Sequence, residues 1–476
     1  MADKIILAEG CEYSSDSEQT GLNNNIIVVG GSGSGKTMSI TEPCLLETHE
    51  RNLIVTVTKP RIVKKYAPMQ RKRGYDVEIL DFTSAENTTI AYDPLYFARS
   101  YDDLMFLARS VVMANPRKKG ENNADPYWDE AAISLCCALM GATMMTHEVP
   151  SFADVVDLYK SLKLECSSSI ITTSLDELFR KLEREAPGCF AVMNWQTFRQ
   201  LPPKTASCVL STLGATMGHL FNPDLLAMMR KPNKLDFRKI ARKKTILYVV
   251  TSPVNPALNA FISQFYATAL KELFEFAEEQ ENMQLPIPTH IICDDFATGA
   301  PIPEFAQYIS IIREKGMSVM VLCQSESQLQ SMYGPSDATT IINNCDTYVF
   351  TGSMDLETAR NISIRLNVPT SEVLTLPLGR FAVFRRGERP VTARRYPILE
   401  NEQYQQVTRE FSTRIALASK SDRTAAPAPR KPKKAVIPYL PQVTKKAVGQ
   451  NPTDDFTDEL MEKFNELFGT SDDDES

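Results

Sequence analysis

One stretch near the start of the chain has residue types and spacing that could bind phosphate. Residues 26–37 read IIVVGGSGSGKT, an apolar strand-like run that leads into glycines, Lys36 and Thr37. Glycines at such a turn let backbone N–H groups converge on phosphate oxygens, and the helix expected after it adds positive potential. In this P-loop pattern Lys36 would neutralise the β and γ phosphates, and the Thr37 hydroxyl would ligate Mg²⁺. The expected binding residues are Gly30, Gly31, Ser32, Gly33, Ser34, Gly35, Lys36 and Thr37.

A second stretch supplies the carboxylates that nucleotide hydrolysis needs. Residues 289–299 read THIICDDFATG, in which an apolar run ends in Asp294 and Asp295. The first carboxylate would hold the water shell of Mg²⁺, and the second would polarise the attacking water. We therefore expect Asp294 at the metal and Asp295 in catalysis.

Two further polar residues flank the next strand-like run. Gln324 ends that run, where a polar side chain points into the ligand crevice of an open α/β sheet. It is expected to sense the γ-phosphate. Arg313 precedes the run. It could enter a neighbouring subunit's site as an arginine finger, or it could make a surface ion pair.

The elements that must position these residues alternate in type along the chain. Strand-like runs alternate with helical segments in a βαβ pattern before and after a long helical stretch. The simplest account is one parallel α/β domain interrupted by an all-α insertion. The expected parts are 1–124 (nucleotide-binding domain, first part), 125–235 (insertion), 236–418 (nucleotide-binding domain, second part) and 419–476 (tail). The expected strands are 26–29, 53–57, 77–80, 245–250, 289–293, 318–323, 347–350 and 380–384.

Charge is distributed unevenly along the chain. The net charge of −7 combines a basic, proline-rich linker after residue 419 with an acidic tail that carries a helical apolar spacing. The tail is interpreted as a protein-interaction element or a segment that folds back on the body. Residues 59–73, KPRIVKKYAPMQRKR, hold no acid and are the candidate DNA contact, against the alternative of a solvated face.

These motifs, in this order, resemble the coupling proteins of conjugative type IV secretion, the TraG/TraD-like DNA-transfer ATPases. Further similar segments lie between Gly21 and Tyr396, namely LIVTVTKPRIVKKY, GYDVEILDF, AYDPL, DPYWDEAA, IIREKG, LCQSESQL and LPLGRFAVFRRGERP. The resemblance implies a RecA-like motor with a helical insertion, assembled as a homo-hexamer around DNA. It also implies ATP with Mg²⁺ as cofactors, hydrolysis at subunit interfaces, and docking of a relaxase or relaxosome to the ATPases or membrane components of a secretion channel.

Three departures from this family keep alternatives open. The usual Asp-Pro-Lys-Gly segment is Thr58-Lys59-Pro60-Arg61 here, and the usual second Glu is Asp295. The shorter side chain withdraws the carboxylate, and a misplacement of ~1 Å can cost ~10²-fold in rate. A nucleotide-switched adaptor that recruits protein substrates without sustained hydrolysis is therefore one alternative. A DNA translocase or packaging motor of the same fold is another.

The third departure is that the sequence has no apolar run of the ~18 residues that a membrane span needs, whereas the family usually has N-terminal membrane helices. We expect a cytoplasmic protein recruited to the inner face of the cell membrane.

Overall fold

The structure is a computed structural model that describes residues 3–113, 126–167, 170–252, 258–296 and 299–424. Contacts divide the chain into two compact units, Met1–Arg414 and Ile415–Ser476. The first unit carries the sheet and every residue of the expected site. The expected tail helix lies outside the described residues.

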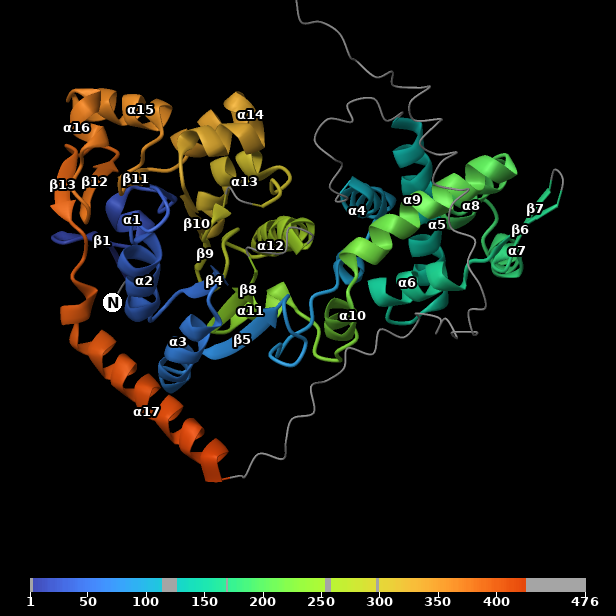
Figure 1. Ribbon diagram of the computed structural model, residues 1–476, viewed down its shortest axis with the longest axis horizontal. Coiled ribbons are helices and arrows are strands. Elements are labelled where there is room, and N and C mark those ends of the chain that lie inside the picture. Colours follow the sequence, from blue (N-terminus) through green and yellow to red (C-terminus); the bar gives the residue numbers. More distant parts are fainter. Residues whose placement is uncertain (1–2, 114–125, 168–169, 253–257, 297–298, 425–476) are drawn as a thin grey trace, which may run out of the picture. The chain divides into compact units, whose positions relative to one another are not determined.

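The first unit is built on a nine-stranded sheet with the order β13-β12-β11-β3-β10-β9-β4-β8-β5 (Figure 1). In this order the strands from β11 to β5 pair in parallel, whereas β12 and β13 add in antiparallel fashion at the other end. All eight expected strands are present to within a residue or so, and β13 was not expected. The strands are β3 (Ile26–Val29), β4 (Asn52–Val57), β5 (Asp76–Asp81), β8 (Thr245–Val250), β9 (Thr289–Cys293), β10 (Met317–Cys323), β11 (Thr347–Phe350), β12 (Arg380–Arg385) and β13 (Val391–Arg394).

Helices cover both faces of this sheet, which explains why its parallel strands are apolar on both sides. In β3, Ile26 and Val28 join one buried cluster, and Ile27 and Val29 join another. The first cluster includes α2 (Glu42–Glu47), α3 (Pro60–Lys72) and the hairpin β1–β2 (Lys4–Ala8 and Cys11–Ser14). The second includes α12 (Asn259–Glu278), α13 (Phe305–Ile311), α14 (Glu326–Asn343), α15 (Leu356–Leu366) and α16 (Thr370–Leu374).

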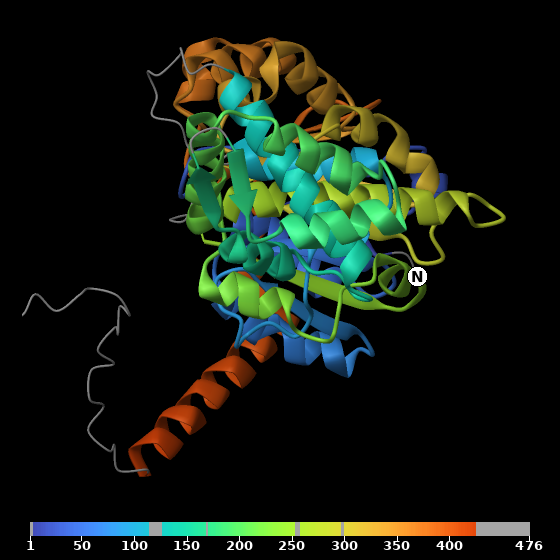
Figure 2. The ribbon, with the colours of Figure 1, turned by 90° about the vertical axis from the view of Figure 1, so that its right-hand side faces the viewer.

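The segment between β5 and β8 is mainly helical. Its helices are α4 (Tyr101–Met113), α5 (Pro126–Thr146), α6 (Phe152–Ser161), α7 (Asp176–Glu185), α8 (Phe190–Arg199), α9 (Pro203–Leu220), α10 (Pro223–Met229) and α11 (Phe237–Arg242). It is not all-α as expected, because β6 (Leu164–Ser167) and β7 (Ile170–Thr173) pair as an antiparallel hairpin (Figure 2). Each strand is four residues long, too short for a clear period in the sequence. The domain boundaries stay a prediction.

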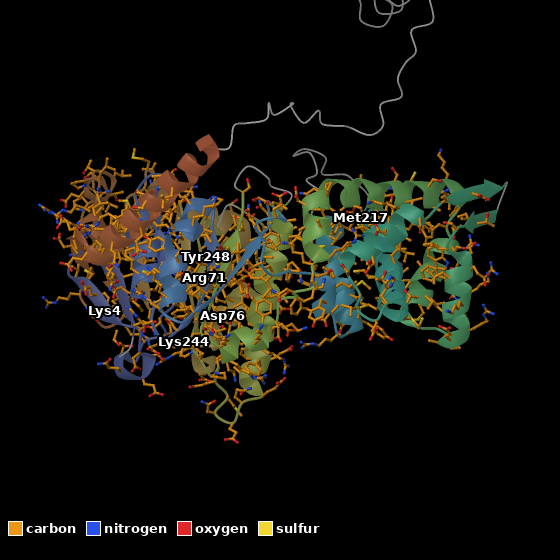
Figure 3. The ribbon with its side chains drawn as sticks, turned by 90° about the horizontal axis from the view of Figure 1, so that it is seen from below. Lys4, Arg71, Asp76, Met217, Lys244 and Tyr248 are labelled. Atoms are coloured by element: carbon orange, nitrogen blue, oxygen red, sulfur yellow. The ribbon has the colours of Figure 1, made fainter. Side chains whose placement is uncertain are left out.

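The basic stretch 59–73 contains the whole of α3, which packs closely on the sheet. The Tyr248 hydroxyl of β8 donates to Gln70 Oε1 at 2.7 Å, and Arg71, which lies close by, donates to the Val77 carbonyl (Figure 3). At the edge of the sheet, the Asp76 N–H of β5 donates to the Lys244 carbonyl, which directly precedes β8.

The helix α17 (Glu402–Thr424) continues past the expected linker start at residue 419. Among the described residues, no helix combines the length and apolarity that crossing a membrane requires.

One buried carboxylate joins the loop after β5 to the start of α6. Asp93 accepts hydrogen bonds from the Leu95 N–H, the Ser151 hydroxyl and the Phe152 N–H. Burial raises its pKa to about 6, against the opposing effect of these donors. The pKa of Asp93 in the folded chain exceeds its usual value, so folding favours the protonated carboxyl. The resulting contribution to the free energy of unfolding is present at low pH and is lost as pH rises through about 6.

We predict that Asp93→Ala lowers the free energy of unfolding by about 2–4 kcal/mol, because each buried donor left unsatisfied costs roughly 1–3 kcal/mol. Chemical denaturation at pH 7 measures this. The exposed Glu86 provides the control, since Glu86→Ala should change stability by less than about 0.5 kcal/mol. Equal effects of the two substitutions on stability would show that Asp93 does not hold the loop after β5 against α6.

Candidate nucleotide-binding site

The P-loop pattern forms the expected strand, loop and helix. β3 ends at Val29, and the helical turn η1 (Thr37–Thr41) leads into α2. Gly33 and Gly35 have φ of 78° and 91°. This left-handed region is strained for other residues and is open to glycine. The loop conformation therefore requires glycine at these two positions.

The ends of two neighbouring strands hold the loop in place. The Gly30 N–H donates to the Cys323 carbonyl at the end of β10, and the Gly31 N–H donates to the Gly352 carbonyl after β11. The Thr351 and Ser34 hydroxyls are 2.8 Å apart. A Cβ at Gly30 would lie only 1.8 Å from Thr351 Oγ1. Gly30 is therefore required by the close approach of the β11 end, a contact that the sequence motif does not reveal.

Lys36 lies at the centre of the loop. Its ammonium donates to the carbonyls of Gly30 and Gly31, and the side chain is 8% exposed. Burial lowers the pKa of Lys36, while Asp294 and Asp295 act in the opposite direction. A positive group with few polar partners is suited to an anionic ligand.

The structure brings the two expected metal-site residues together. The Thr37 hydroxyl donates to Asp294 Oδ2 at 2.8 Å. Burial raises the pKa of Asp294, opposed by the hydrogen bond from Thr37, and Asp295 raises it further. Among the described residues, no group of three or more His, Cys, Asp or Glu side chains could hold a metal. The pair fits Mg²⁺, which binds through one or two protein oxygens and takes its other ligands from water and phosphate.

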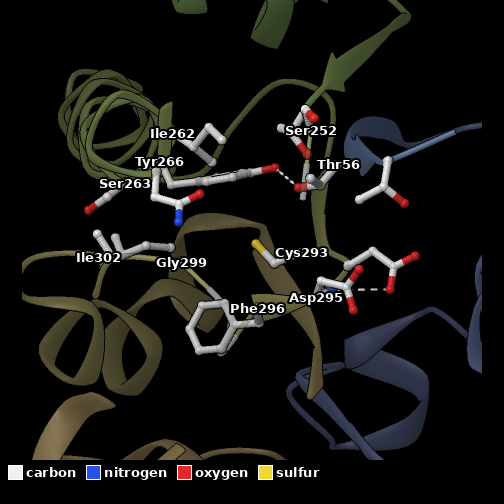
Figure 4. A pocket seen from close by; sticks show the side chains of 15 residues that line it. Thr56, Ser252, Ile262, Ser263, Tyr266, Cys293, Asp295, Phe296, Gly299 and Ile302 are labelled. Atoms are coloured by element: carbon white, nitrogen blue, oxygen red, sulfur yellow. Dashed lines mark hydrogen bonds between the residues drawn. The ribbon is translucent and has the colours of Figure 1, made fainter. Parts of the chain in front are cut away.

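Asp295 lines a small pocket of about 70 Å³. Its φ of 54° is in the left-handed region, which Asp tolerates better than most residues. Such backbone strain is concentrated at functional sites. Thr56, Ser252 and Tyr266 are among the residues that line the pocket, which has room for a few water molecules (Figure 4). The pocket therefore offers space for water beside the expected catalytic carboxylate.

Gln324 and Arg313 lie at opposite ends of β10. Cys323 pairs with Val29 of β3, so the following Gln324 is adjacent to the start of the P-loop. Arg313 precedes the strand and donates to the Gly21 carbonyl at 2.9 Å. Seven residues of β10 separate the two ends, roughly 23 Å at about 3.3 Å per residue. The structure thus brings Lys36, Thr37, Asp294, Asp295 and Gln324 to one edge and places Arg313 at the other edge. Their roles stay predictions.

Sequence reasoning missed the contribution of Thr351. The only signal in the sequence is that a small polar residue and a glycine directly follow an apolar strand-like run. That signal does not identify the strand as a neighbour of the P-loop strand. The pairing of β11 with β3 makes the connection.

The fold and this loop define a P-loop nucleotide-binding domain with a helical insertion. Residues 6–378 match the family described as "Type IV secretory system Conjugative DNA transfer". The chain belongs to this family, and the resemblance stated from the sequence is confirmed.

Solved structures have the same fold. The plasmid coupling protein TrwB in complex with ADP and Mg²⁺ is 18% identical, with a TM-score of 0.59 over 83% of this chain and 90% of that chain. TrwBdeltaN70 in complex with sulphate is 19% identical, with a TM-score of 0.57 over 79% and 86%. VirB4 of Thermoanaerobacter pseudethanolicus is 13% identical, with a TM-score of 0.50 over 85% and 98%. A comparison with curated protein sequences finds no match. The expected α/β fold class is confirmed.

We predict that Gly30→Ala weakens nucleotide binding about fivefold or more, because overpacking of a tight contact costs about 1–3 kcal/mol. Gly31→Ala is the matched control, since its Cβ would lie at an ordinary 3.7 Å from the Gly352 carbonyl. Titration with a fluorescent ATP analogue measures both. The double variant Gly30→Ala, Thr351→Ala should recover part of the loss. Equal affinities of the two alanine variants would contradict the close-packing argument.

Proposed function

We propose that this chain is an ATP-driven coupling protein of conjugative DNA transfer. It binds DNA, the relaxosome or both, and delivers them to a type IV secretion channel. The observation that supports this most is the Thr37–Asp294 hydrogen bond. It joins the P-loop to the carboxylate strand in a chain whose family is defined by conjugative DNA transfer.

The residues divide the chemistry of ATP hydrolysis between them. Lys36 and the loop N–H groups bind the β and γ phosphates, while Thr37 and Asp294 hold Mg²⁺, which neutralises phosphate charge when bound. Asp295 orients the attacking water and accepts its proton as the water oxygen bonds to the γ-phosphorus and ADP leaves. Gln324, at the end of the intervening strand, reports whether the γ-phosphate is present.

The proposal names ATP, and structures of TrwB support it. TrwB has been solved in complex with ADP and Mg²⁺ and with a non-hydrolysable ATP analogue. It has also been solved with a non-hydrolysable GTP analogue. The fold thus accepts both bases in that protein, so the preference of this chain for ATP is to be measured against GTP.

Arg313 is proposed to act on a neighbouring copy in a homo-hexamer. Its guanidinium is exposed, and its one hydrogen bond among the described residues is to the Gly21 carbonyl. The separation across β10 is too long for it to reach its own P-loop. An exposed arginine at the opposite edge is suited to stabilise transition-state charge in trans.

The proposed DNA contact narrows to the start of α3. Four basic side chains of residues 59–73 have partners within the chain: Lys65 with Glu42, Arg71 with the Val77 carbonyl, Lys72 with Glu410, and Arg73 with the Leu46 and Thr48 carbonyls. Lys59, Arg61 and Lys64 are exposed and have no such partner within the described part of the chain. Three unpaired cations suit contacts to phosphates of any sequence.

A nucleotide-switched adaptor is the second candidate function. The observation in its favour is the short Asp295 side chain on a strained backbone, which can bind nucleotide without turning it over efficiently. A packaging or translocating motor of the same fold has no observation that sets it apart. Recruitment to the inner membrane face, and contacts with a relaxase or channel ATPases, are part of the coupling-protein proposal.

We predict that the purified chain hydrolyses ATP, that single- or double-stranded DNA increases the rate, and that Lys36→Ala abolishes the increase. A steady-state phosphate-release assay measures this. Lys204→Ala, an exposed lysine in α9, serves as the control and should match wild type. Tight ATP binding without turnover under every DNA condition would favour the adaptor, and equal turnover by Lys36→Ala would refute the assigned site.

We also predict that Arg313→Ala lowers ATP turnover at least tenfold while ATP affinity stays within about twofold, as for a group that acts in the transition state. Mixing Arg313→Ala with Lys36→Ala subunits should restore part of the activity, because each supplies what the other lacks. Glu314→Ala, the exposed neighbour, is the control and should retain full activity. Absence of restored activity in assembled mixtures would argue against a role in trans.

A further inference from the structure

A second cation approaches the P-loop from within the same chain. Arg395 directly follows β13, where the sequence patterns assign it no role. A Cβ built on Gly35 would lie 4.0 Å from Arg395 Nη1, and its other near neighbour is Ser39 Oγ at 3.5 Å. The guanidinium therefore borders the glycine that precedes Lys36.

The backbone of Arg395 is fixed while its charged end is available. Its N–H donates to the Gly379 carbonyl at 2.7 Å, and its aliphatic stem passes over Gly379, whose built Cβ would be 3.6 Å from Arg395 Cδ. The side chain is exposed. Within the described residues it makes no ion pair, whereas Arg385 and Arg386, at the other end of β12, pair with Glu388 and Asp346. An arginine left without a carboxylate beside a phosphate loop has its donors free for an anion.

The sheet order determines from which side Arg395 reaches the loop. β3 lies between β11 and β10, with β9 and its carboxylates beyond β10. β12 and β13 lie beyond β11, on the other flank. The loop thus has the metal-site carboxylates on one side and a free guanidinium on the other. Phosphate oxygens that do not face Mg²⁺ would meet Arg395.

We infer that Arg395 is a phosphate-binding residue of the nucleotide site, acting within its own subunit. Its guanidinium donates to oxygens of the nucleotide's α- or β-phosphate on the flank opposite Asp294. This deepens the proposed function, on which it rests, by giving the site a second fixed cation besides Lys36. A planar fork of donors suits two phosphate oxygens at once, which a lysine ammonium cannot reproduce.

The test compares the binding of ADP and of a non-hydrolysable ATP analogue by calorimetry. Arg395→Ala should bind both about tenfold more weakly, since the variant loses hydrogen bonds to charged phosphate oxygens whose strength exposure to solvent reduces. Arg395→Lys should recover part of the loss. Arg394→Ala, the adjacent exposed arginine, should bind within about twofold of wild type. The loss should shrink as salt rises from low to physiological concentration.

Two controls keep the outcomes distinct. Without nucleotide, Arg395→Ala should have the same melting temperature as wild type. If its melting temperature is lower, the affinity of Arg395→Lys decides: partial recovery supports a lost phosphate contact, and no recovery indicates a folding defect, which would overturn the inference. If Lys36→Ala loses binding but Arg395→Ala matches wild type, Arg395 is a surface arginine and the inference is overturned. If wild type binds no nucleotide, the proposed function itself fails.

Discussion

The hydrogen bond between the Thr37 hydroxyl and Asp294 is the contact on which the rest of the site depends. The two residues are 257 positions apart in the chain. They meet because β10 alone separates the P-loop strand from the carboxylate strand. Parallel strands bring their carboxyl ends to one edge, so the sheet order, more than any single side chain, assembles the site. The helical segment between β5 and β8 can vary without changing this edge.

The site places opposite charges where little water reaches them. Lys36 and Asp294 are each 8% exposed, and burial disfavours the charged form of both. Each charge offsets part of the other's desolvation, although within the described residues neither side chain makes a direct ion pair. A bound nucleotide with its cation would supply further charged partners to both residues.

Local patterns made the P-loop, the strands and the paired carboxylates predictable. Each is encoded within about a dozen residues, where apolar period and glycine chemistry act directly. Thr351 and Arg395 could not be found in this way, because their positions depend on β11 pairing with β3 and on two antiparallel strands added beyond it. The β6–β7 hairpin was missed for the opposite reason, since its strands are too short to leave a pattern. The basic segment was noted, but Glu42 and Glu410, the acids that pair with its Lys65 and Lys72, lie 23 and 338 positions away in the sequence.

Arg313 and the P-loop face opposite edges of one sheet, and this has a consequence for symmetry. A contact that uses both joins unlike surfaces, so it cannot be made by two copies related by a two-fold axis. Each added copy repeats the same rotation and offers one donor edge and one acceptor edge. Such a head-to-tail assembly of subunits has a direction, and every subunit has both contacts only when the assembly closes into a ring. If Arg313 acts on a neighbouring copy as proposed, the copy at one end of an open assembly would keep an unfinished site, and activity would depend on closure.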